Sequence, residues 1–325
     1  MRENFVSVVM TCHNEALFIE EAIRSVLAQT AYDRIGEIFV VNDGSTDGSA
    51  SILDRLSHEI PKLSVIRSTG IGPSAARNLA LERVKGTHVA FLDGDDLWAP
   101  DKTERQLKAF DASPMIALVY SDFYDFTMPD ARDRKLISVR PFHFDDADVL
   151  TTYFLHDAPA MPSATIIAVK ALDEVGFFDP SIRLGEDTEL FLRIARCGRF
   201  QHVRGGLLFK RRHNANSSRD LSRWDEAAER VSDIAIKAMP ELADFRSRRT
   251  ASRRVKIASA YLSAGDREQA WRYLIRAIKG NPFNARAYVL VGLACLPFSL
   301  RGRIIGWLRS LRAHLRANVV LVRNR

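Results

Sequence analysis

Short apolar runs alternate with segments of helical periodicity through the first hundred residues of the chain. Each apolar run ends in glycine or polar residues, and the runs are residues 5–11, 37–41, 63–67 and 89–92. Between them, apolar side chains recur at the spacing of amphipathic helices: at Ile19, Ala22, Ile23, Val26 and Leu27, over residues 49–56, and around Arg77, Asn78 and Leu81. Strands that alternate with helices predict right-handed βαβ crossovers and a mostly parallel sheet.

The pattern continues to about residue 209 with one irregular interruption. The expected order is helix 100–110, strand 116–120, strand 163–169, helix 171–175, helix 188–197 and strand 200–209. Residues 125–160 contain Pro129, Pro141 and Pro159 and show no clear period. Because a long irregular segment inside a compact domain is usually functional, we expect an acceptor-side loop there.

From about residue 223 the periodicity is helical. Three amphipathic helices are expected, at residues 251–264, 266–279 and 284–295, and their small residues resemble one tetratricopeptide-type hairpin. A last helix, over residues 300–322, has an apolar face flanked by arginines. That face consists of Leu300, Ile304, Trp307, Leu308, Leu311 and Leu315, and the arginines are Arg301, Arg309, Arg312 and Arg316.

The sequence therefore predicts three parts. Residues 1–220 form an α/β domain, residues 221–296 an all-α region, and residues 297–325 a basic amphipathic helix.

The charge of the chain is strongly asymmetric. The formal net charge is +7, but residues 1–245 carry −9 and residues 246–325 carry +16, with Asp266 and Glu268 as the acids of that segment. An acidic body with a basic tail indicates an anionic partner, either a membrane surface or nucleic acid. The apolar face of the last helix favours an anionic membrane surface and no nucleic acid. The alternative is that this face packs on the helical hairpin and the arginines are solvated.

Composition also bears on the compartment. The three cysteines, Cys12, Cys197 and Cys295, lack metal-ligand spacing, and an odd number predicts reduced thiols and a cytoplasmic protein. No signal peptide pattern is visible, and no run reaches the ~20 apolar residues of a spanning helix. We expect a peripheral protein at the inner face of the plasma membrane.

A cluster of carboxylates follows the apolar run at residues 89–92. Asp93, Asp95 and Asp96 lie within four residues, and such carboxylates raise one another's pKa unless a cation relieves them. Oxygen ligands of this kind suit a divalent metal held by Asp95 and Asp93, with water and phosphate completing the shell. The alternative is an acidic turn before the helix that Pro100 begins.

Two other strand ends are polar and should meet the same sheet edge. They are residues 11–15, which include Thr11, Asn14 and Glu15, and residues 43–47. Asp43 can accept the imide N–H of uracil, and Arg77 suits a base or a phosphate. Taken singly, Asp43-Gly44 is a common turn pair and Arg77 an ordinary solvated residue. Together they predict a nucleotide site.

These motifs resemble one known family. Residues 8–15, 41–47, 76–78 and 91–100 are similar, in order and spacing, to the family 2 inverting glycosyltransferases of the GT-A fold, over about residues 4–215. The resemblance implies a GT-A domain and a nucleotide-sugar donor, most often a UDP-sugar. It implies Mg²⁺ or Mn²⁺ at Asp93 and Asp95, and nucleoside contacts from Asp43 and Arg77.

The resemblance also places the catalytic base. Gly185-Glu186-Asp187 matches the family's Glu-Asp pair, in which the aspartate takes the proton of the acceptor hydroxyl. The structural alternative is that both acids cap the following helix. His213 lies in a basic loop that would cover the diphosphate, although a solvated basic loop is equally ordinary. The Gln-x-x-Arg-Trp motif of processive members is absent, which favours transfer of a single sugar.

Two rival interpretations remain. Residues 63–75 followed by Asp93 mimic a dinucleotide fingerprint, which would indicate an NAD-dependent oxidoreductase, but they leave Asp43, Asp95 and Asp187 unexplained. A catalytically inactive sugar-nucleotide-binding protein would carry the same motifs. We therefore expect an inverting glycosyltransferase with a saccharide or lipid-linked acceptor, acting in cell-surface polysaccharide or glycolipid synthesis.

Overall fold

The computed structural model describes residues 2–127, 134–137, 149–156, 161–213 and 221–296. The predicted helix at 300–322 and most of the irregular segment 125–160 lie outside these residues. The chain divides into two compact units, residues 1–243 and residues 244–325, and each is described by itself. The helix at residues 221–238 belongs to the first unit.

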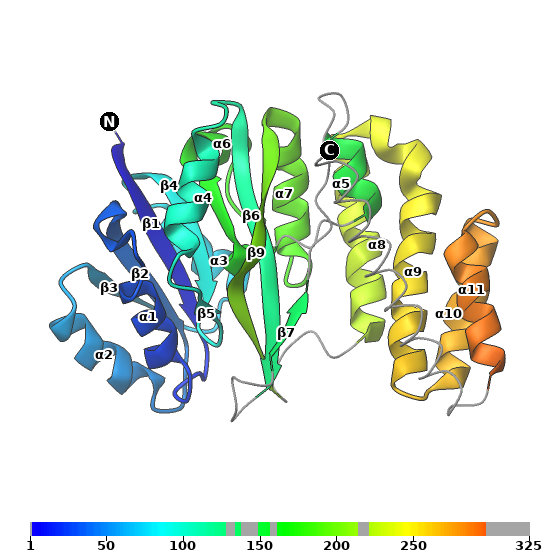
Figure 1. Cartoon of the computed structure of the whole chain (residues 1–325), viewed down its shortest axis with the longest axis horizontal. Coiled ribbons are helices and arrows are strands. Elements are labelled where there is room, and N and C mark those ends of the chain that lie inside the picture. Colours follow the sequence, from blue (N-terminus) through cyan, green and yellow to red (C-terminus); the bar gives the residue numbers. More distant parts are fainter. Residues whose placement is uncertain (1, 128–133, 138–148, 157–160, 214–220, 297–325) are drawn as a thin grey trace, which may run out of the picture. The chain divides into compact units, whose positions relative to one another are not determined.

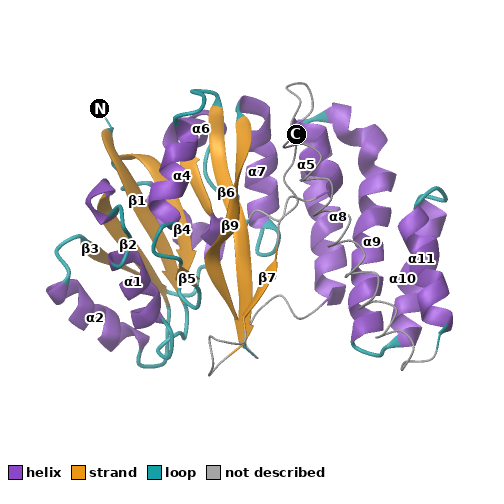
Figure 2. Ribbon diagram, viewed as in Figure 1, coloured by secondary structure: helices purple, strands orange, loops and turns teal. Residues whose placement is uncertain are grey.

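The first unit is built on one nine-stranded sheet (Figures 1 and 2). Its strand order is β3-β2-β1-β4-β8-β6-β9-β5, with β7 paired to β6. The strands are β1 (Glu3–Cys12), β2 (Ile35–Asp43), β3 (Leu63–Ser68), β4 (Gly86–Asp93), β5 (Leu97–Trp98), β6 (Ile116–Thr127), β7 (Arg134–Ile137), β8 (Thr165–Ala168) and β9 (Arg199–Arg212).

The sheet is parallel in its first half and mixed in its second. Strands β1 to β4 pair in parallel, as the alternation of strands and helices predicts. Strand β8 then enters antiparallel between β4 and β6, whereas β6 and β9 pair in parallel. The predicted α/β class is confirmed, and the sheet is a mixed one.

Helices flank the sheet, and several lie where the helical periodicity predicts them. The helix at residues 149–156 was not predicted, because it lies, with strand β7, inside the segment 125–160 that the sequence predicts to be irregular. The helices are α1 (Ile19–Leu27), α2 (Ser49–Glu59), α3 (Pro73–Leu81), α4 (Lys102–Phe110), α5 (Val149–His156), α6 (Val169–Val175), α7 (Glu186–Cys197) and α8 (Leu221–Ala238), with 3-10 turns at Tyr32–Arg34, Pro162–Ala164 and Pro240–Phe245. The core is fully buried where the strands are continuously apolar, as at Val8, Val40, Ala90 and Ile166. This burial is why those runs carry no polar alternation.

Strand register brings the polar strand ends together. Thr11 of β1 pairs with Val41 of β2 on one side and with Asp93 of β4 on the other. Because these strands are parallel, their carboxyl ends meet at one edge of the sheet, which is where open α/β sheets bind ligands.

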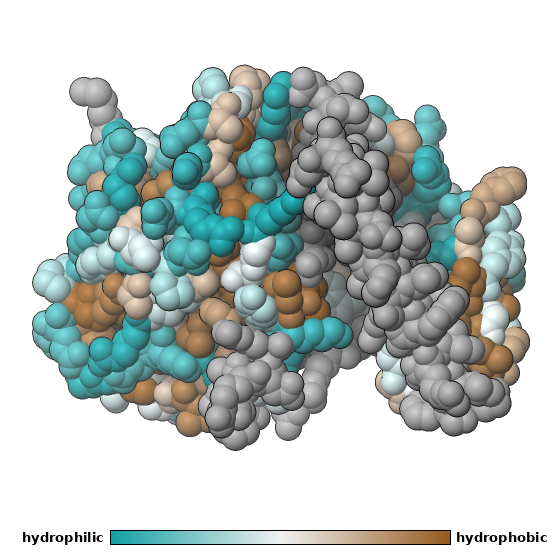
Figure 3. Space-filling model, in the orientation of Figure 1, coloured by the Kyte–Doolittle hydropathy of each residue, from teal (hydrophilic) through white to brown (hydrophobic). Residues whose placement is uncertain are grey.

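In its described residues, the second unit contains α9 (Arg246–Ser263), α10 (Arg267–Gly280) and α11 (Ala285–Cys295). Side-chain caps begin the last two helices: Asp266 accepts from the Gln269 amide at 3.0 Å and Asn284 from the Ala287 amide at 3.3 Å. The predicted all-α character of this region is confirmed. Hydrophobic surface over α10 and α11 is visible in Figure 3 and includes Ile275, Phe283, Tyr288 and Val289.

Candidate active site

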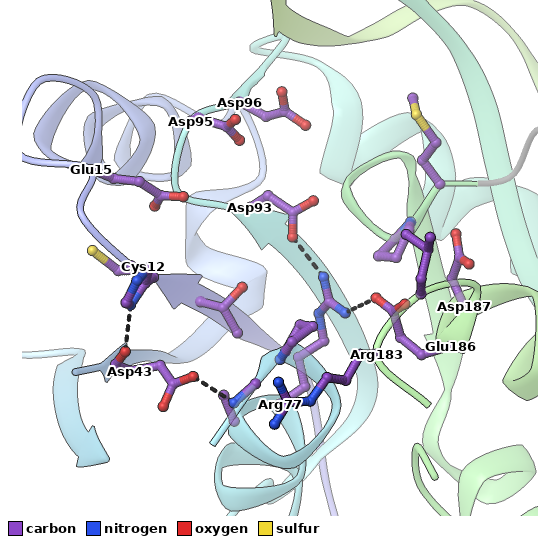
Figure 4. A pocket seen from close by; sticks show the side chains of 18 of the residues that line it. Cys12, Glu15, Asp43, Arg77, Asp93, Asp95, Asp96, Arg183, Glu186 and Asp187 are labelled. Carbon is purple, nitrogen blue, oxygen red and sulfur yellow. Dashed lines mark hydrogen bonds and ion pairs between the residues drawn. The ribbon is translucent and has the colours of Figure 1, made fainter. Parts of the chain in front are cut away.

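A cavity of about 520 Å³ lies at the carboxyl ends of β1, β2 and β4 (Figure 4). Its walls come from the strand ends, the start of α3, the start of α7 and the end of β9. Every residue that the sequence singles out lines it: Thr11, Asn14, Glu15, Asp43, Arg77, Asp93, Asp95, Asp187 and His213. The structure thus brings together residues spread over two hundred positions, and their individual roles stay predictions.

Asp43 organises the turn at one end of the cavity. Its Oδ1 accepts hydrogen bonds from the Ser68 hydroxyl and from the amides of Gly70 and Ile71, and its Oδ2 accepts from the Gly72 amide at 2.8 Å. Burial opposes ionisation of this carboxyl, but the four donors outweigh it and hold the pKa of Asp43 below its ordinary value. Asp43 is therefore an ionised carboxylate whose Oδ2 keeps acceptor capacity.

The same hydrogen bonds argue against the dinucleotide interpretation. In a dinucleotide fold the amides of a Gly-rich turn are directed at a pyrophosphate. Here the amides of residues 70–72 point at a carboxylate of the protein itself. The turn that mimics the fingerprint therefore positions Asp43 and does not present its amides to a diphosphate.

The turn after β1 is held by polar contacts to the end of β2. Asn14 adopts a left-handed φ of 57°, and its Oδ1 accepts from the Thr46 amide at 2.7 Å. Glu15 follows and packs against the backbone of Gly94, where a Cβ would lie 1.9 Å from the Glu15 Oε2. Only glycine at position 94 leaves room for this side chain.

Four carboxylates gather around that glycine. Burial, followed by the charges of Asp95, Asp93 and Asp96, raises the pKa of Glu15 to about 9. Its buried Oε2 has no hydrogen-bond partner in the part of the chain that the structure describes. Burial and Asp93 likewise raise the pKa of Asp95, despite a 2.8 Å contact from the His213 Nε2 to the Asp95 Oδ2. The cluster holds more negative charge than the neighbouring cations relieve.

This arrangement fits a divalent cation bound together with phosphate. The side chain of Asp93 is 37% exposed and that of Asp95 is 15% exposed, so both reach the cavity. Among the described residues, no group of three or more His, Cys, Asp or Glu side chains is close enough to hold an ion by itself. Carboxylate oxygens completed by phosphate and water are the usual environment of Mg²⁺ and Mn²⁺.

Strand β9 fixes the carboxylate cluster from the far side. The Arg211 amide donates to the Asp96 Oδ1 at 3.0 Å, and its guanidinium donates to the Asp95 carbonyl at 2.8 Å and to the Glu21 Oε2 at 2.6 Å. Arg211 is 1% exposed and lies between the rings of Phe18 and Phe126. A cation this deeply buried is stabilised by these contacts and in turn sets the position of the acidic loop.

Arg77 connects the two acidic groups of the cavity. Its guanidinium donates to the Asp93 Oδ1 at 2.8 Å and to the Glu186 Oε1 at 2.9 Å, and the side chain is 6% exposed (Figure 4). Arg77 was expected at the nucleoside. In the structure two of its guanidinium nitrogens are already bound by carboxylates, and its nucleoside contact stays a prediction.

Asp187 lies in the first turn of α7, one residue beyond Glu186. Burial, followed by the charge of Glu186, raises the pKa of Asp187 to about 6, although the Thr188 amide donates to its Oδ1 at 2.7 Å. Gly185, which directly precedes the helix, adopts a left-handed φ of 81°. Glu186 is thus held by Arg77, whereas Asp187 keeps a carboxylate oxygen for the cavity.

The cavity also contains residues that sequence reasoning did not assign. They are Met161, Pro162, Arg183, Leu184 and Trp224, which come from loops and from α8. Their segments are tied to the site by long-range contacts, such as the 2.7 Å hydrogen bond from the Ser74 hydroxyl to the Ile182 carbonyl. The proximity of residues 183–184 to the Glu186–Asp187 pair was the one signal available.

Residues 7–174 match the family described as Glycosyl transferase family 2. The chain belongs to this family. An uncharacterized glycosyltransferase of Nostoc sp. is 29% identical over 218 residues, which cover 65% of this chain and 66% of the relative. The chain spans about a third of several other bacterial relatives.

Solved structures of low identity share the family fold. TarS of S. aureus, solved in complex with UDP-GlcNAc, superposes with a TM-score of 0.61 at 19% identity, covering 88% of this chain and 83% of that one. A mannosyltransferase of Pyrobaculum calidifontis, in complex with GDP-Man and Mn²⁺, gives 0.53 at 21% identity, covering 86% and 87%. The predicted GT-A architecture is confirmed.

Proposed function

We propose that this protein transfers a single sugar from a nucleotide-sugar donor, a UDP-sugar, to an acceptor hydroxyl with inversion at the anomeric carbon. The observation that carries the proposal is one shared cavity with an ionised carboxylate at one end, an acidic cluster beside it, and a carboxyl of raised pKa at the start of α7. Family membership supports the reaction class.

The donor would occupy the strand-end side of the cavity. Asp43 and Arg77 are proposed to contact the nucleoside, Thr11, Asn14 and Glu15 to line the donor site, and His213 to approach the diphosphate. Asp93 and Asp95 would hold Mg²⁺ or Mn²⁺, which supplies charge stabilisation for the departing nucleoside diphosphate. The unrelieved charge of the cluster supports this assignment, as does the Mn²⁺ in the mannosyltransferase structure.

Asp187 is proposed as the general base. The acceptor oxygen forms a bond to the anomeric carbon as the bond from that carbon to the diphosphate oxygen breaks, and the acceptor proton passes to the Asp187 carboxylate. A carboxyl with a pKa of about 6 is mostly ionised at neutral pH, yet it is more basic than an ordinary aspartate. Arg77 restrains the adjacent Glu186, which leaves Asp187 as the carboxylate that can take the proton.

The acceptor and the setting are also part of the proposal. We expect a saccharide or lipid-linked acceptor of cell-surface polysaccharide or glycolipid synthesis, delivered at the inner face of the plasma membrane. None of the described helices is long and apolar enough to cross a membrane. The basic helix proposed to bind anionic lipid, residues 297–325, lies outside the described residues.

A donor screen followed by a transfer assay tests the function. Nucleotide sugars are added with Mn²⁺ or with EDTA. The correct donor raises the melting temperature because it binds the native state and not the unfolded chain. It should do so only with Mn²⁺, because the proposed site binds the diphosphate through the metal. Product formation with that donor, with the anomeric configuration read by NMR, establishes inverting transfer. Retention of configuration would contradict the proposal, and stabilisation without any turnover would identify a catalytically inactive binding protein instead.

A further inference from the structure

Arg183 is a cation of the cavity without a partner among the described residues. Its side chain is exposed, it lines the cavity, and it makes no hydrogen bond or ion pair with the residues that the structure describes. The contrast with Arg77 is clear, since Arg77 donates to two carboxylates and is nearly buried. Because an arginine presents five N–H donors in a planar fork, Arg183 can bind a ligand without breaking a hydrogen bond or ion pair to the residues that the structure describes.

The loop that carries Arg183 is fastened along α3. The Asn78 side chain donates to the Phe178 carbonyl at 2.8 Å and accepts from the Phe178 amide at 3.1 Å. Nearer Arg183, the Ser74 hydroxyl donates to the Ile182 carbonyl at 2.7 Å. Arg183 therefore follows a residue that is bound to the first turn of α3.

That first turn of α3 is also bound to Asp43. Helix α3 begins at Pro73, and the preceding Gly72 donates its amide to the Asp43 Oδ2. Asp43 and Arg183 thus flank the same short segment, Gly72 to Ser74. In Figure 4 the guanidinium of Arg183 extends toward Asp43 and Arg77 and away from Asp187. Arg183 consequently belongs to the nucleoside end of the cavity and not to the acceptor end.

We propose that Arg183 and Asp43 together select the nucleobase, by binding an edge that carries an N–H beside a carbonyl oxygen. This inference rests on the proposed nucleotide-sugar donor and names its base class. The Asp43 carboxylate accepts the ring N–H, and the Arg183 guanidinium donates to the adjacent carbonyl oxygen. Uracil and guanine present that pair of groups.

Cytosine and adenine present the opposite arrangement. They place a ring nitrogen acceptor where the carboxylate stands and an amino donor where the guanidinium stands. Both contacts become repulsive or unmatched, so selection works by exclusion as well as by attraction. Arg183 is in this sense a specificity-determining residue.

Nucleoside diphosphates, which lack the sugar that is transferred, test this selection through their binding affinity without any turnover. UDP, CDP, GDP and ADP are titrated in a calorimeter in the presence of Mn²⁺, with wild type, Arg183→Gln and Arg183→Lys. For the wild type we expect UDP to bind about 10- to 100-fold more tightly than CDP, or GDP to bind more tightly than ADP by the same factor. This is the effect of a charge-assisted hydrogen bond to a matched base. Arg183→Gln should lose the part of that advantage that the guanidinium supplies, by weaker UDP or GDP binding, while Asp43 still favours the ring N–H. CDP and ADP binding should not weaken, because neither base offers a carbonyl oxygen at that position. Arg183→Lys keeps the charge but not the fork, and should retain part of the preference.

Arg196→Gln is the matched control, because Arg196 is an exposed arginine at the other end of α7. It should bind all four nucleotides as the wild type does, and urea unfolding without nucleotide should be the same for all the variants. An equal loss of UDP and CDP binding in Arg183→Gln would show a phosphate contact and overturn the inference. A wild type that does not discriminate among the bases would also overturn it, while the nucleotide site itself would stand. If no diphosphate binds the wild type, the proposed function fails, and this inference fails with it.

Discussion

The carboxylate of Asp187 should cost the protein stability at neutral pH, and removing its charge should restore it. Asp187 ionises with an ordinary pKa of 3.8 in the unfolded chain and with a pKa of about 6 in the folded one. A factor of ten in proton affinity corresponds to about 1.4 kcal/mol, so ionised Asp187 destabilises the fold by on the order of 3 kcal/mol. The penalty is absent below about pH 4 and complete above about pH 6, because only the ionised form is disfavoured.

Asp187→Asn isolates this penalty. The amide oxygen of asparagine can still accept from the Thr188 amide, so the local geometry is kept. Urea unfolding without donor should show the variant more stable than the wild type by up to about 3 kcal/mol at pH 8, and by about half as much at pH 5. The same substitution should lower kcat by ~10²–10⁴ and leave donor affinity intact. The wild-type rate should rise as the pH passes 6 and then level off.

The helix-capping interpretation predicts the opposite sign. A carboxylate in the first turn of a helix stabilises it by ~0.3–1 kcal/mol, so its removal would destabilise the protein at neutral pH. Glu20 provides the control, since it occupies the same position in α1 but is 34% exposed and bonded to Arg24 and Arg55, which lower its pKa. Glu20→Gln should weakly destabilise the fold at pH 8. If Asp187→Asn behaves like Glu20→Gln, the base assignment is wrong.

Two further predictions concern the metal and the tail. Asp95→Asn should sharply weaken Mn²⁺-dependent UDP binding in calorimetry without unfolding the protein. Asp111→Asn changes an exposed aspartate as a control and should leave UDP binding unchanged. Unchanged Mn²⁺-dependent binding in Asp95→Asn would show that Asp95 does not hold the metal. The full chain should float with anionic vesicles, and less so in high salt, because each Lys or Arg near the surface contributes about 1 kcal/mol. A chain ending at Leu296 should stay in the soluble fraction, and equal flotation of both chains would exclude the membrane role of residues 297–325.

Local patterns were sufficient to predict the first half of the sheet. Apolar runs such as residues 5–11 and 89–92 are buried on both faces, so their composition alone identifies them as parallel strands. Parallel pairing then determines which strand ends meet. This is why the sequence alone predicts that Thr11, Asp43 and Asp93 lie at one edge of the sheet.

The second half depended on contacts that no local pattern encodes. Strand β6 runs to Thr127 because it pairs with β9 as far as Arg212, well past the expected end at residue 120. The same holds for side chains: Arg77 lines the cavity, but its two carboxylate partners lie 16 and 109 residues away in the sequence. Arg183 was not predicted to line the cavity, because its loop is positioned by hydrogen bonds to α3 and not through any motif of its own.

The fastening of the acidic loop by β9 has a consequence for the order of events during synthesis. Asp96 accepts a hydrogen bond from Arg211, which is synthesised 115 residues later. Asp95 contacts His213, which is synthesised 118 residues later. At ribosomal speeds of ~5–20 residues per second, those carboxylates stay without these partners for several seconds after they emerge. A fragment that stops at residue 174, where the family match ends, would lack Glu186, Arg211 and His213 altogether. The nascent chain can therefore assemble the parallel half of its sheet early, but it completes the sheet and the cavity only when strand β9 has been synthesised.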